Sequence, residues 1–400
     1  MTSSPTPPED KKRPIQGDIQ IGFDSFSEQG PGIFLSRLKA ELETRNRYNE
    51  ETPDVWILLP FQTVPDAIQT RVRLKQTKIL LRLNGCYCMR HYTVRKPFTL
   101  PLPILDTLRS KRVNARKNAQ IRHNFALADH IIYQSHFSKK LTETFVKPTT
   151  QPPAGESIIL NGIPLSHFFP SNPTASGKSI SDNSPLAPFS DRLNILVSHS
   201  FRPYHRLHDS FRILAQYNKT YPDRKAHLHI LGDDDNSGSF KYAKTIAQQL
   251  ALQENEDYTF WDKQHHSQLP PFYQGCDMML NLSYWDSCPN VVVEAMASGL
   301  PVVGVNHGGV AELVSPHPNH TAGGTLVSEK IPFTYIDHMS FERMPKAPIK
   351  AYVKAIETTA QNTVKLSQLA RAHAEVHFDI RDICDAYLTA AERTFWNPAE

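Results

Sequence analysis

Short apolar runs recur along the chain and alternate with longer segments whose apolar residues suit one face of a helix. Runs of this kind, bounded by turn residues, are typical of buried strands. Their alternation with helical segments predicts an α/β fold. The predicted strands are Ile19–Phe23, Val55–Leu59, Lys78–Leu83, Ala128–Gln134, Leu193–Ser198, Ala226–Gly232, Tyr258–Trp261 and Pro301–Val305.

The stretch from residue 281 to residue 314, NLSYWDSCPNVVVEAMASGLPVVGVNHGGVAELV, gives the clearest pattern. A short apolar run ends at Ser283, and a polar turn follows. Pro289 is predicted to open a helix, because proline is tolerated at the first helical position, and Gly299 to end it. The valine-rich strand Pro301–Val305 and a second helix come next. In such units the ligand binds beyond the carboxyl ends of the strands, at the helix N-termini.

Two acids in this stretch, Asp286 and Glu294, are eight residues apart. Asp286 lies in the predicted loop, and Glu294 lies about one turn inside the helix. The helix start offers free N–H groups and a positive dipole end to an anion, and the two acids can accept hydrogen bonds from hydroxyl groups. This combination suits a phosphorylated sugar or a nucleotide sugar. The alternative is an ordinary helix start, with Asp286 or Ser287 as the cap and Glu294 on the surface.

The segment DSCPNVVVEAMASGLPVVGVNHGGVAELV closely resembles the signature of the retaining glycosyltransferases of family 4, which have the GT-B fold. Those enzymes carry an acid and a glutamate separated by seven residues, then E-A-x-A-x-G-x-P-V-V and G-G-x-x-E. Asp286 stands where many members have glutamate. Further similar segments are ADHIIYQS at 128–135 and SIILNGIPLSHFFP at 157–170, and the resemblance extends over residues 19–395.

The resemblance implies two Rossmann-like, doubly wound α/β domains that face a central cleft. The segment between them is rich in Ser, Pro and Asn, which predicts a linker. The N-terminus is rich in proline and charge, which predicts disorder. The expected division is a tail at 1–17, an acceptor domain at 18–170, a linker at 171–190, a nucleotide-sugar domain at 191–380 and a helix at 381–400 that crosses back to the first domain.

Two short motifs of the N-terminal half bear on the site. Gly30 and Gly32 flank Pro31 before a predicted helix, and a glycine turn there lets the backbone approach a phosphate closely. A plain turn is the alternative, whereas the resemblance implies that this loop faces the sugar and the diphosphate. Arg82 and Asn84 lie in LRLNGCYC, where the family often has R-x-D-G-x-Y. Arg82 fits a buried structural role and a ligand contact equally well, and Asn84 replaces the aspartate.

Arg202 and Arg206 are four residues apart and could share a helix face near its start. Guanidinium groups there can hold a diphosphate, and two exposed arginines without such a role are the alternative. The resemblance implies a basic pair on the diphosphate, because relatives read R-P-x-K-R-L. His205 stands at the lysine position, so either Arg206 or a protonated His205 would supply the second charge.

The resemblance further implies a retaining transferase with a UDP- or GDP-sugar donor. The acceptor is expected to be a hydroxyl group of a glycan, a glycolipid or a polysaccharide precursor. Glu294 would accept hydrogen bonds from the ribose hydroxyls, while Asp286 and the backbone amides of Ser287, Cys288 and Asn290 would contact the transferred sugar. Catalysis would be largely electrostatic. No metal or other cofactor is expected.

Composition narrows the partners and the compartment. The 400 residues include 44 basic and 40 acidic side chains, and the net charge of +4 is too balanced for nucleic acid to be a main partner. No apolar run approaches the roughly 20 residues of a membrane span. The N-terminus lacks the apolar core of a signal peptide. Five scattered cysteines suit reduced thiols, so we expect a cytoplasmic protein.

The segment from Asp106 to Arg122 is basic and predicts a helix. A stripe of charge is commonly just a solvated face. The sharper interpretation is that residues 109–122 contact anionic lipid or an anionic acceptor, which would make the protein peripheral at the inner membrane face. The cations are Arg109, Lys111, Arg112, Arg116, Lys117 and Arg122.

Two other functions stay open. The first is a catalytically silent protein on the GT-B fold that binds nucleotide sugars or protein partners, and the departures at Asn84 and His205 leave room for it. The second is a GT-B-like isomerase or phosphorylase, but the cofactor lysine motif of a phosphorylase is not seen. The run Asp233–Asp235 is interpreted as an exposed loop rather than a metal site.

Overall fold

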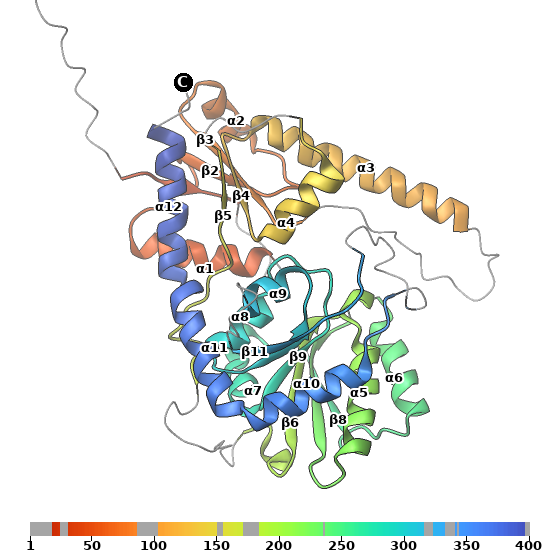
Figure 1. Cartoon of the computed structure of the whole chain (residues 1–400). Helices are drawn as coiled ribbons and strands as arrows, with labels where there is room; N and C mark the ends of the chain where they lie inside the picture. Colours follow the sequence, from red (N-terminus) through yellow and green to blue (C-terminus); the bar gives the residue numbers. More distant parts are fainter. Residues whose placement is uncertain are drawn as a thin grey trace, which may run out of the picture.

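The computed structural model describes residues 18–24, 31–85, 103–149, 155–170, 184–234, 237–315, 323–332, 341 and 344–396. The described strands form two sheets, one from each half of the chain. Figure 1 shows the sheets in two separate domains, with the C-terminal helix running from the second domain back along the first.

The N-terminal sheet has the strand order β1-β2-β3-β4-β5, and its pairs are parallel. Its central strands are buried and mainly apolar, as expected for a parallel sheet that is covered on both faces. The strands are β1 Ile21–Gly22, β2 Val55–Leu58, β3 Lys78–Leu83, β4 His130–Tyr133 and β5 Glu156–Ile158. The helices are α1 Pro31–Thr44, α2 Asp66–Arg73, α3 Pro103–Leu127 and α4 His136–Leu141, which continues into the π-helical turn Thr142–Val146.

The C-terminal sheet has the order β11-β10-β9-β6-β7-β8 and is also parallel. Its strands are β6 Leu193–Ser200, β7 Ala226–Asp233, β8 Tyr258–Trp261, β9 Met278–Asn281, β10 Val302–Val305 and β11 Gly324–Val327. The helices are α5 Leu207–Thr220, α6 Ser239–Gln249, α7 Pro270–Gly275, α8 Asn290–Ala297, α9 Gly308–Val314 and α10 Ile349–Gln361. Short 3-10 turns are formed by Ala187–Phe189, Pro203–His205 and His266–Gln268.

The strand order of this sheet reverses between β6 and β9, which pair with each other. The loops that leave the two strands therefore diverge beyond their carboxyl ends. Ligands of open α/β sheets bind at such a switch point. The two loops are residues 201–206 and residues 282–289, and they contain Arg202 and Asp286.

Helix α8 begins one residue later than predicted. Pro289 takes an extended conformation (φ −65°, ψ 116°) and caps the helix, so Asn290 is its first residue. Gly299 has a φ of 68°, in the left-handed region that favours glycine, and it follows the helix end as predicted. Glu294 lies inside α8 and Asp286 lies in the loop before it, as the sequence predicts.

Helix α11 (Thr363–His377) leads into α12 (Ile380–Trp396), which lies along α1 of the N-terminal domain (Figure 1). The contact is apolar at its centre, where the rings of Phe34 and Tyr387 have centroids 5.8 Å apart. Phe395 and Trp396, at the end of α12, pack against the same cluster. The last helix thus completes the core of the first domain.

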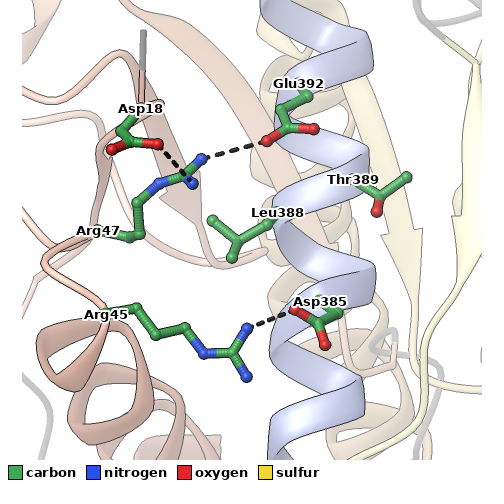
Figure 2. A pocket seen from close by; sticks show the side chains of 7 residues that line it. All are labelled: Asp18, Arg45, Arg47, Asp385, Leu388, Thr389 and Glu392. Carbon is green, nitrogen blue, oxygen red and sulfur yellow. Dashed lines mark hydrogen bonds and ion pairs between the residues drawn. The ribbon is translucent and has the colours of Figure 1, made fainter.

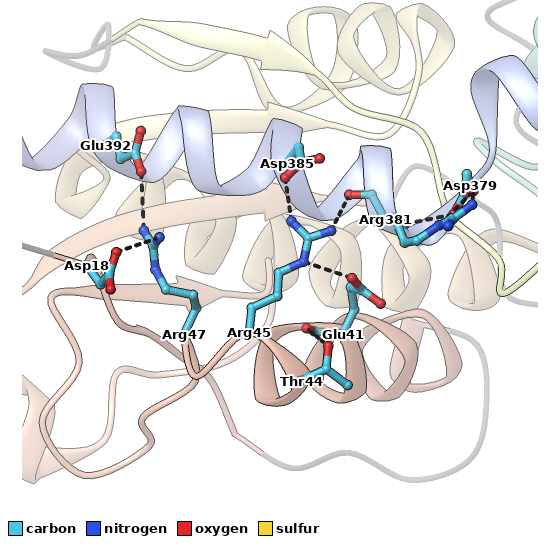
Figure 3. Close-up of polar contacts among 9 residues, drawn as sticks. All are labelled: Asp18, Glu41, Thr44, Arg45, Arg47, Asp379, Arg381, Asp385 and Glu392. Atoms are coloured by element: carbon cyan, nitrogen blue, oxygen red, sulfur yellow. Dashed lines mark hydrogen bonds and ion pairs between the residues drawn. The ribbon is translucent and has the colours of Figure 1, made fainter.

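Charged side chains border this helix contact. Arg47 donates to Glu392 of α12 (3.2 Å) and to Asp18 (3.3 Å), and Arg45 pairs with Asp385 (Figure 3). These residues line a hollow of about 440 Å³ between α12 and the end of α1 (Figure 2). Because both arginines already have acidic partners, the hollow offers an anion little uncompensated positive charge.

Of the predicted linker at 171–190, residues 184–190 are described. Leu186 has no exposed surface, and its side chain lies against Gly275 at the end of α7. The low apolar content of the whole segment gives no sign of this buried residue.

Candidate active site

Asp286 shapes the loop that follows β9. Its carboxylate accepts a hydrogen bond from the backbone N–H of Cys288 (3.1 Å), and its carbonyl accepts one from Gly309 (2.8 Å). Burial raises the pKa of the carboxyl to about 6, while the Cys288 amide and the positive charge of Arg202 act in the opposite direction. Asp286 is therefore ionised near neutral pH but protonated in mild acid.

The G-G pair at the start of α9 lets this helix pack closely against the Asp286 loop. A Cβ atom at Gly309 would lie 2.1 Å from the carbonyl oxygen of Ser287 and 2.8 Å from that of Asp286. No residue with a side chain fits there without moving the loop. The glycine of the sequence motif is thus explained by close backbone contact between α9 and the Asp286 loop.

Arg202 follows β6 and is exposed. Its guanidinium Nη1 donates to the hydroxyl of Tyr204 (3.2 Å), and its charge acts on Asp286. Its backbone N–H donates to Nδ1 of His205 (3.0 Å), whose ring stacks on His199 with centroids 4.1 Å apart. Burial, aided by the neighbouring His199 and Arg202, holds the pKa of His205 well below its usual value. This environment favours neutral His205 and does not support the alternative in which a protonated His205 supplies the second charge.

Arg202 and Arg206 do not share a helix face, contrary to the prediction. Pro203 starts a 3-10 turn that ends at His205, and α5 begins only at Leu207. Arg206 connects the two elements in the left-handed conformation, with a φ of 53°. The break in helical geometry sends the two arginines in different directions.

Arg206 is fully buried in an ion pair with Glu329. Nη1 and Nη2 donate to the two carboxylate oxygens at 2.7 and 2.9 Å, and Nε and Nη2 donate to the carbonyl of Leu282 at 2.9 and 2.8 Å. Nη1 also reaches the carbonyl of Pro345 (3.4 Å). A guanidinium has five N–H donors, and these contacts engage all of them. Arg206 can therefore hold a diphosphate only if its pair with Glu329 breaks.

Glu294 is also buried, with 3% of its surface exposed. Its Oε1 accepts hydrogen bonds from Arg37 Nη2 (2.6 Å) and faces Nε2 of His266 (3.2 Å), and its Oε2 accepts one from the hydroxyl of Tyr273 (2.7 Å). Burial alone would raise the pKa of Glu294, but His266, Arg37 and Tyr273 outweigh it and lower the pKa. Glu294 is thus an ionised carboxylate that is sealed from solvent.

Arg37 was not singled out from the sequence. It lies in α1 of the N-terminal domain, 257 residues before Glu294, and the surrounding helix gives no local sign of a distant acid. Its charge between the buried Leu35 and Leu38 is the one feature that could have drawn attention to it. The contact places a cation of the first domain on the predicted ribose acceptor of the second.

Asn161 of the N-terminal domain holds the start of α8. Its side-chain amide donates to the carbonyl of Cys288 (3.0 Å) and to Oδ1 of Asn290 (2.9 Å). Ser287 lies beside them, and its Oγ is 3.8 Å from the position of a Cβ atom at Gly85, the residue after Asn84. The predicted sugar-contact residues therefore lie where the two domains meet.

Arg82 was interpreted either as a buried structural residue or as a ligand contact, and its position fits the structural role. It has no exposed surface, its Nε donates to the hydroxyl of Tyr387 (2.8 Å), and its guanidinium lies over the ring of Phe34 (4.3 Å). Gly32 is inside α1, where its carbonyl accepts a hydrogen bond from Ser36 (2.9 Å). Gly30 lies outside the described residues, so the expected closure of this loop over a diphosphate stays a prediction.

Glu312, the acid of the G-G-x-x-E segment, joins the domains at another point. Its carboxylate accepts hydrogen bonds from the backbone N–H groups of His136 (2.8 Å) and Phe137 (2.6 Å) at the start of α4. The ring of Phe137 packs edge-on against Trp285, next to Asp286, with centroids 5.7 Å apart. The sequence pattern contains Glu312 but does not reveal its partner.

The acidic run Asp233–Asp235 begins at the end of β7, beside the loop that follows β6. Asp233 accepts a hydrogen bond from Ser200 (2.5 Å), Asp234 accepts one from the backbone of Phe240 (3.1 Å), and Asp235 is not described. The described residues contain no cluster of three His, Cys, Asp or Glu side chains suited to a metal. Within the same residues, no helix combines the length and the apolar character needed to span a membrane.

The basic segment forms α3, a long helix that projects from the N-terminal domain (Figure 1). Its predicted helical character is confirmed. Lys111, Arg112, Arg116 and Arg122 are exposed, whereas the side chain of Arg109 lies outside the description. Arg122 also donates to the carbonyl of Val146 (3.1 Å), which ties the base of the helix to the domain.

Comparison with known protein families gives a match in the segment that contains Arg202, Asp286 and Glu294. Residues 181–330 match the family described as glycosyl transferases group 1. No curated protein sequence matches the chain.

Solved structures match nearly the whole chain and show the fold. Anabaena Alr3699/HepE in complex with UDP has a TM-score of 0.62 at 15% identity, over 92% of this chain and 98% of that chain. Sucrose-phosphate synthase from Thermosynechococcus elongatus has a TM-score of 0.56 at 15% identity, over 94% and 85%. A glycosyltransferase from Rickettsia africae has a TM-score of 0.56 at 14% identity, over 93% and 84%. The chain has the GT-B fold, and the segment that is similar to the glycosyl transferases group 1 family lies in its C-terminal domain.

Proposed function

We propose that this protein is a retaining glycosyltransferase that moves a sugar from a nucleotide-diphosphate sugar to a hydroxyl acceptor. The observation that carries the proposal is that the positive charge of Arg202 acts on Asp286 at the switch point of the C-terminal sheet, beside the N-terminus of α8. A cation, an anion and a helix start at one place suit a ligand that combines phosphate and hydroxyl groups. Structures of Alr3699/HepE in complex with UDP-glucose, and with UDP and glucose, support this assignment.

The chemistry follows from the charges. Arg202 is exposed and can contact the donor's diphosphate, where it offsets the negative charge that develops as the glycosidic bond breaks. Asp286 is ionised at neutral pH and accepts hydrogen bonds from sugar hydroxyls. An acceptor hydroxyl then attacks an oxocarbenium-like sugar, and the nucleoside diphosphate leaves. Retention of the anomeric configuration is part of the proposal and is checked by NMR analysis of the first product formed.

Glu294 receives the ribose hydroxyls in this proposal, which requires a rearrangement. The carboxylate is 3% exposed and held by Arg37 from the other domain. A ribose reaches it only after Arg37 withdraws. Donor binding is therefore coupled to a relative movement of α1 and α8.

The exposed basic side chains of α3 are proposed to interact with the acceptor. Lys111, Arg112 and Arg116 are exposed side chains of α3, which projects from the N-terminal domain (Figure 1). A cationic helix suits anionic lipid or an anionic glycan. We propose a lipid-linked or glycan acceptor that is approached through this helix.

A catalytically silent binding protein on the same fold is the second candidate. The observation that favours it is that Glu294 and Arg206 are both engaged in buried ion pairs, with Arg37 and with Glu329. If these pairs never open, Glu294 and Arg206 cannot take the roles in donor binding that transfer requires.

A thermal-shift screen against UDP-, GDP- and ADP-sugars tests the proposal. A ligand that binds only the folded state must raise the melting temperature. We expect a shift with a UDP- or GDP-sugar, followed by release of the nucleoside diphosphate when an acceptor is supplied. A shift with no turnover against any acceptor would support the silent binding protein, and no shift with any nucleotide sugar would overturn both.

A further inference from the structure

A chain of hydrogen bonds runs from the C-terminal helix into the candidate active site. Tyr387 in α12 accepts a hydrogen bond from Nε of Arg82 in β3 (2.8 Å), and Nη2 of Arg82 donates to Oδ1 of Asn161 (2.6 Å). The Asn161 amide in turn donates to Cys288 and Asn290 at the start of α8. The backbone N–H of Cys288 donates to the carboxylate of Asp286. Side chains from three distant segments thus end on one loop.

Every polar group of the Asn161 side chain makes a hydrogen bond in this series. Its oxygen accepts from Arg82, and its two N–H groups donate to the carbonyl of Cys288 (3.0 Å) and to Oδ1 of Asn290 (2.9 Å). The backbone N–H of Asn161 also points to the Cys288 sulfur at 3.4 Å. A fully satisfied amide fixes the rotamer of Asn161 and, through it, the position of the loop carbonyl.

These hydrogen bonds matter energetically because the residues that form them are buried. Arg82 and Tyr387 have no exposed surface, Asn161 is 4% exposed and Cys288 is 5% exposed. Water cannot replace a lost partner at such sites, so each missing hydrogen bond is left uncompensated. The loop therefore depends on these particular partners.

The segment that contains Asn161 is hydrogen-bonded to the backbone at the start of α12. The backbone N–H of Ile163 donates to the carbonyl of Phe378 (2.7 Å), and that of Ile380 donates to the carbonyl of Ile163 (3.0 Å). A Cβ atom at Gly162 would meet Ile380 at 2.9 Å, so only glycine lets the two segments approach this closely. Asn161 is thus anchored where the chain returns to the first domain.

We propose that Asn161 is a positioning residue for the donor loop, defined as residues 286–290. It sets the loop from the opposite domain, and Arg82 and Tyr387 hold Asn161 in place. The inference rests on the proposed function, because the loop matters for transfer only if the donor binds there. It adds a cross-domain determinant of donor binding that has no contact of its own with the sugar.

The substitution Asn161→Asp separates this role from a purely structural one. It keeps an oxygen for Arg82 but removes both N–H donors to the loop. Asn124→Ala is the matched control, because Asn124 is equally buried in the same domain and donates to the carbonyls of Pro60 (3.1 Å) and Gln62 (2.9 Å), far from the loop in sequence. We expect Asn161→Asp to raise the donor KM roughly tenfold, with a smaller effect on kcat, and Asn124→Ala to lower the melting temperature with the donor KM unchanged.

A second readout does not depend on activity. Cys288 is buried beneath Asn161, so its alkylation by iodoacetamide, followed by peptide mass analysis, reports loosening of the loop. Tyr387→Phe removes the hydroxyl that accepts the hydrogen bond from Arg82. We expect Cys288 to be labelled faster in Asn161→Asp and in Tyr387→Phe than in Asn124→Ala. Equal labelling and equal donor KM in Asn161→Asp and Asn124→Ala would overturn the positioning role. If the wild-type protein binds no nucleotide sugar but the labelling difference persists, the proposed function fails while the loop contact stands.

Discussion

Arg37 and Glu294 form an ion pair across the boundary between the two domains, with Arg37 Nη2 2.6 Å from Glu294 Oε1. Both side chains are buried, and the carboxylate is also held by Tyr273. Glu294 is the residue on which the sequence pattern places the donor's ribose. The pair therefore links nucleotide binding to the relative position of the domains.

Removal of the Arg37 cation is expected to strengthen nucleotide binding. In Arg37→Met the guanidinium no longer competes for Glu294, so the binding-competent state is more populated and the apparent Kd for the nucleoside diphosphate falls roughly fivefold. Isothermal titration calorimetry measures the change. The control is Glu312→Gln, which weakens another contact between the domains without touching Glu294. Weaker binding in Arg37→Met would show that Arg37 belongs to the binding site, and equal changes in both variants would point to general loosening of the domains.

Arg202 and Arg206 are expected to respond in opposite ways to substitution. Arg202 is exposed, so Arg202→Met should leave the melting temperature almost unchanged and weaken binding of the nucleoside diphosphate at least tenfold. Arg206→Met leaves Glu329 buried without its partner and should cost about 3–5 kcal/mol of folding free energy. Urea denaturation and calorimetry separate the two effects. A stable Arg206→Met variant with lost nucleotide binding would contradict the structural role of Arg206.

The raised pKa of Asp286 predicts a stability difference that depends on pH. An acid whose pKa rises from 3.8 to about 6 on folding binds more protons in the folded state between these values, so its contribution to stability falls as the pH rises through that window. Asp286→Asn keeps an oxygen for the Cys288 amide and cannot ionise. The variant should therefore melt at a higher temperature than the wild type at pH 7.5, with the difference shrinking toward pH 4. A difference that does not change with pH would contradict the burial of an ionised Asp286.

The exposed cations of α3 predict binding to anionic membranes. Co-sedimentation should show the wild-type protein on vesicles that contain phosphatidylglycerol but not on pure phosphatidylcholine, with binding lost at high salt. Replacement of Lys111, Arg112 and Arg116 by glutamate should abolish it. The matched control replaces three exposed lysines of the C-terminal domain, Lys219, Lys241 and Lys365. If that control loses binding to the same extent, α3 has no special role.

Local pattern predicted the local geometry of the site. The apolar runs of the C-terminal half became β9 and β10, and Asp286 and Glu294 lie in the loop and the helix where the spacing places them. These features depend on residues within one or two turns of each other. The resemblance added the two-domain fold, which the described sheets confirm.

The contacts that decide how the site works were not predictable in this way. Arg37 and Glu294 are 257 residues apart, and Arg206 and Glu329 are 123 residues apart. No periodicity connects such residues, because their contact depends on the complete packing of the domains. The predicted helical pairing of Arg202 and Arg206 failed for a local reason, since Pro203 and the left-handed Arg206 break the helix between them.

The most direct test of the account is a calorimetric titration of UDP, GDP and ADP into the wild-type protein and into Glu294→Gln. The substitution removes the carboxylate charge but keeps the size of the side chain. We expect at least one nucleoside diphosphate to bind the wild type and Glu294→Gln to weaken its binding at least tenfold, or by about 1.4 kcal/mol. Absence of binding by all three nucleotides, or equal affinity of the two proteins, would contradict this expectation.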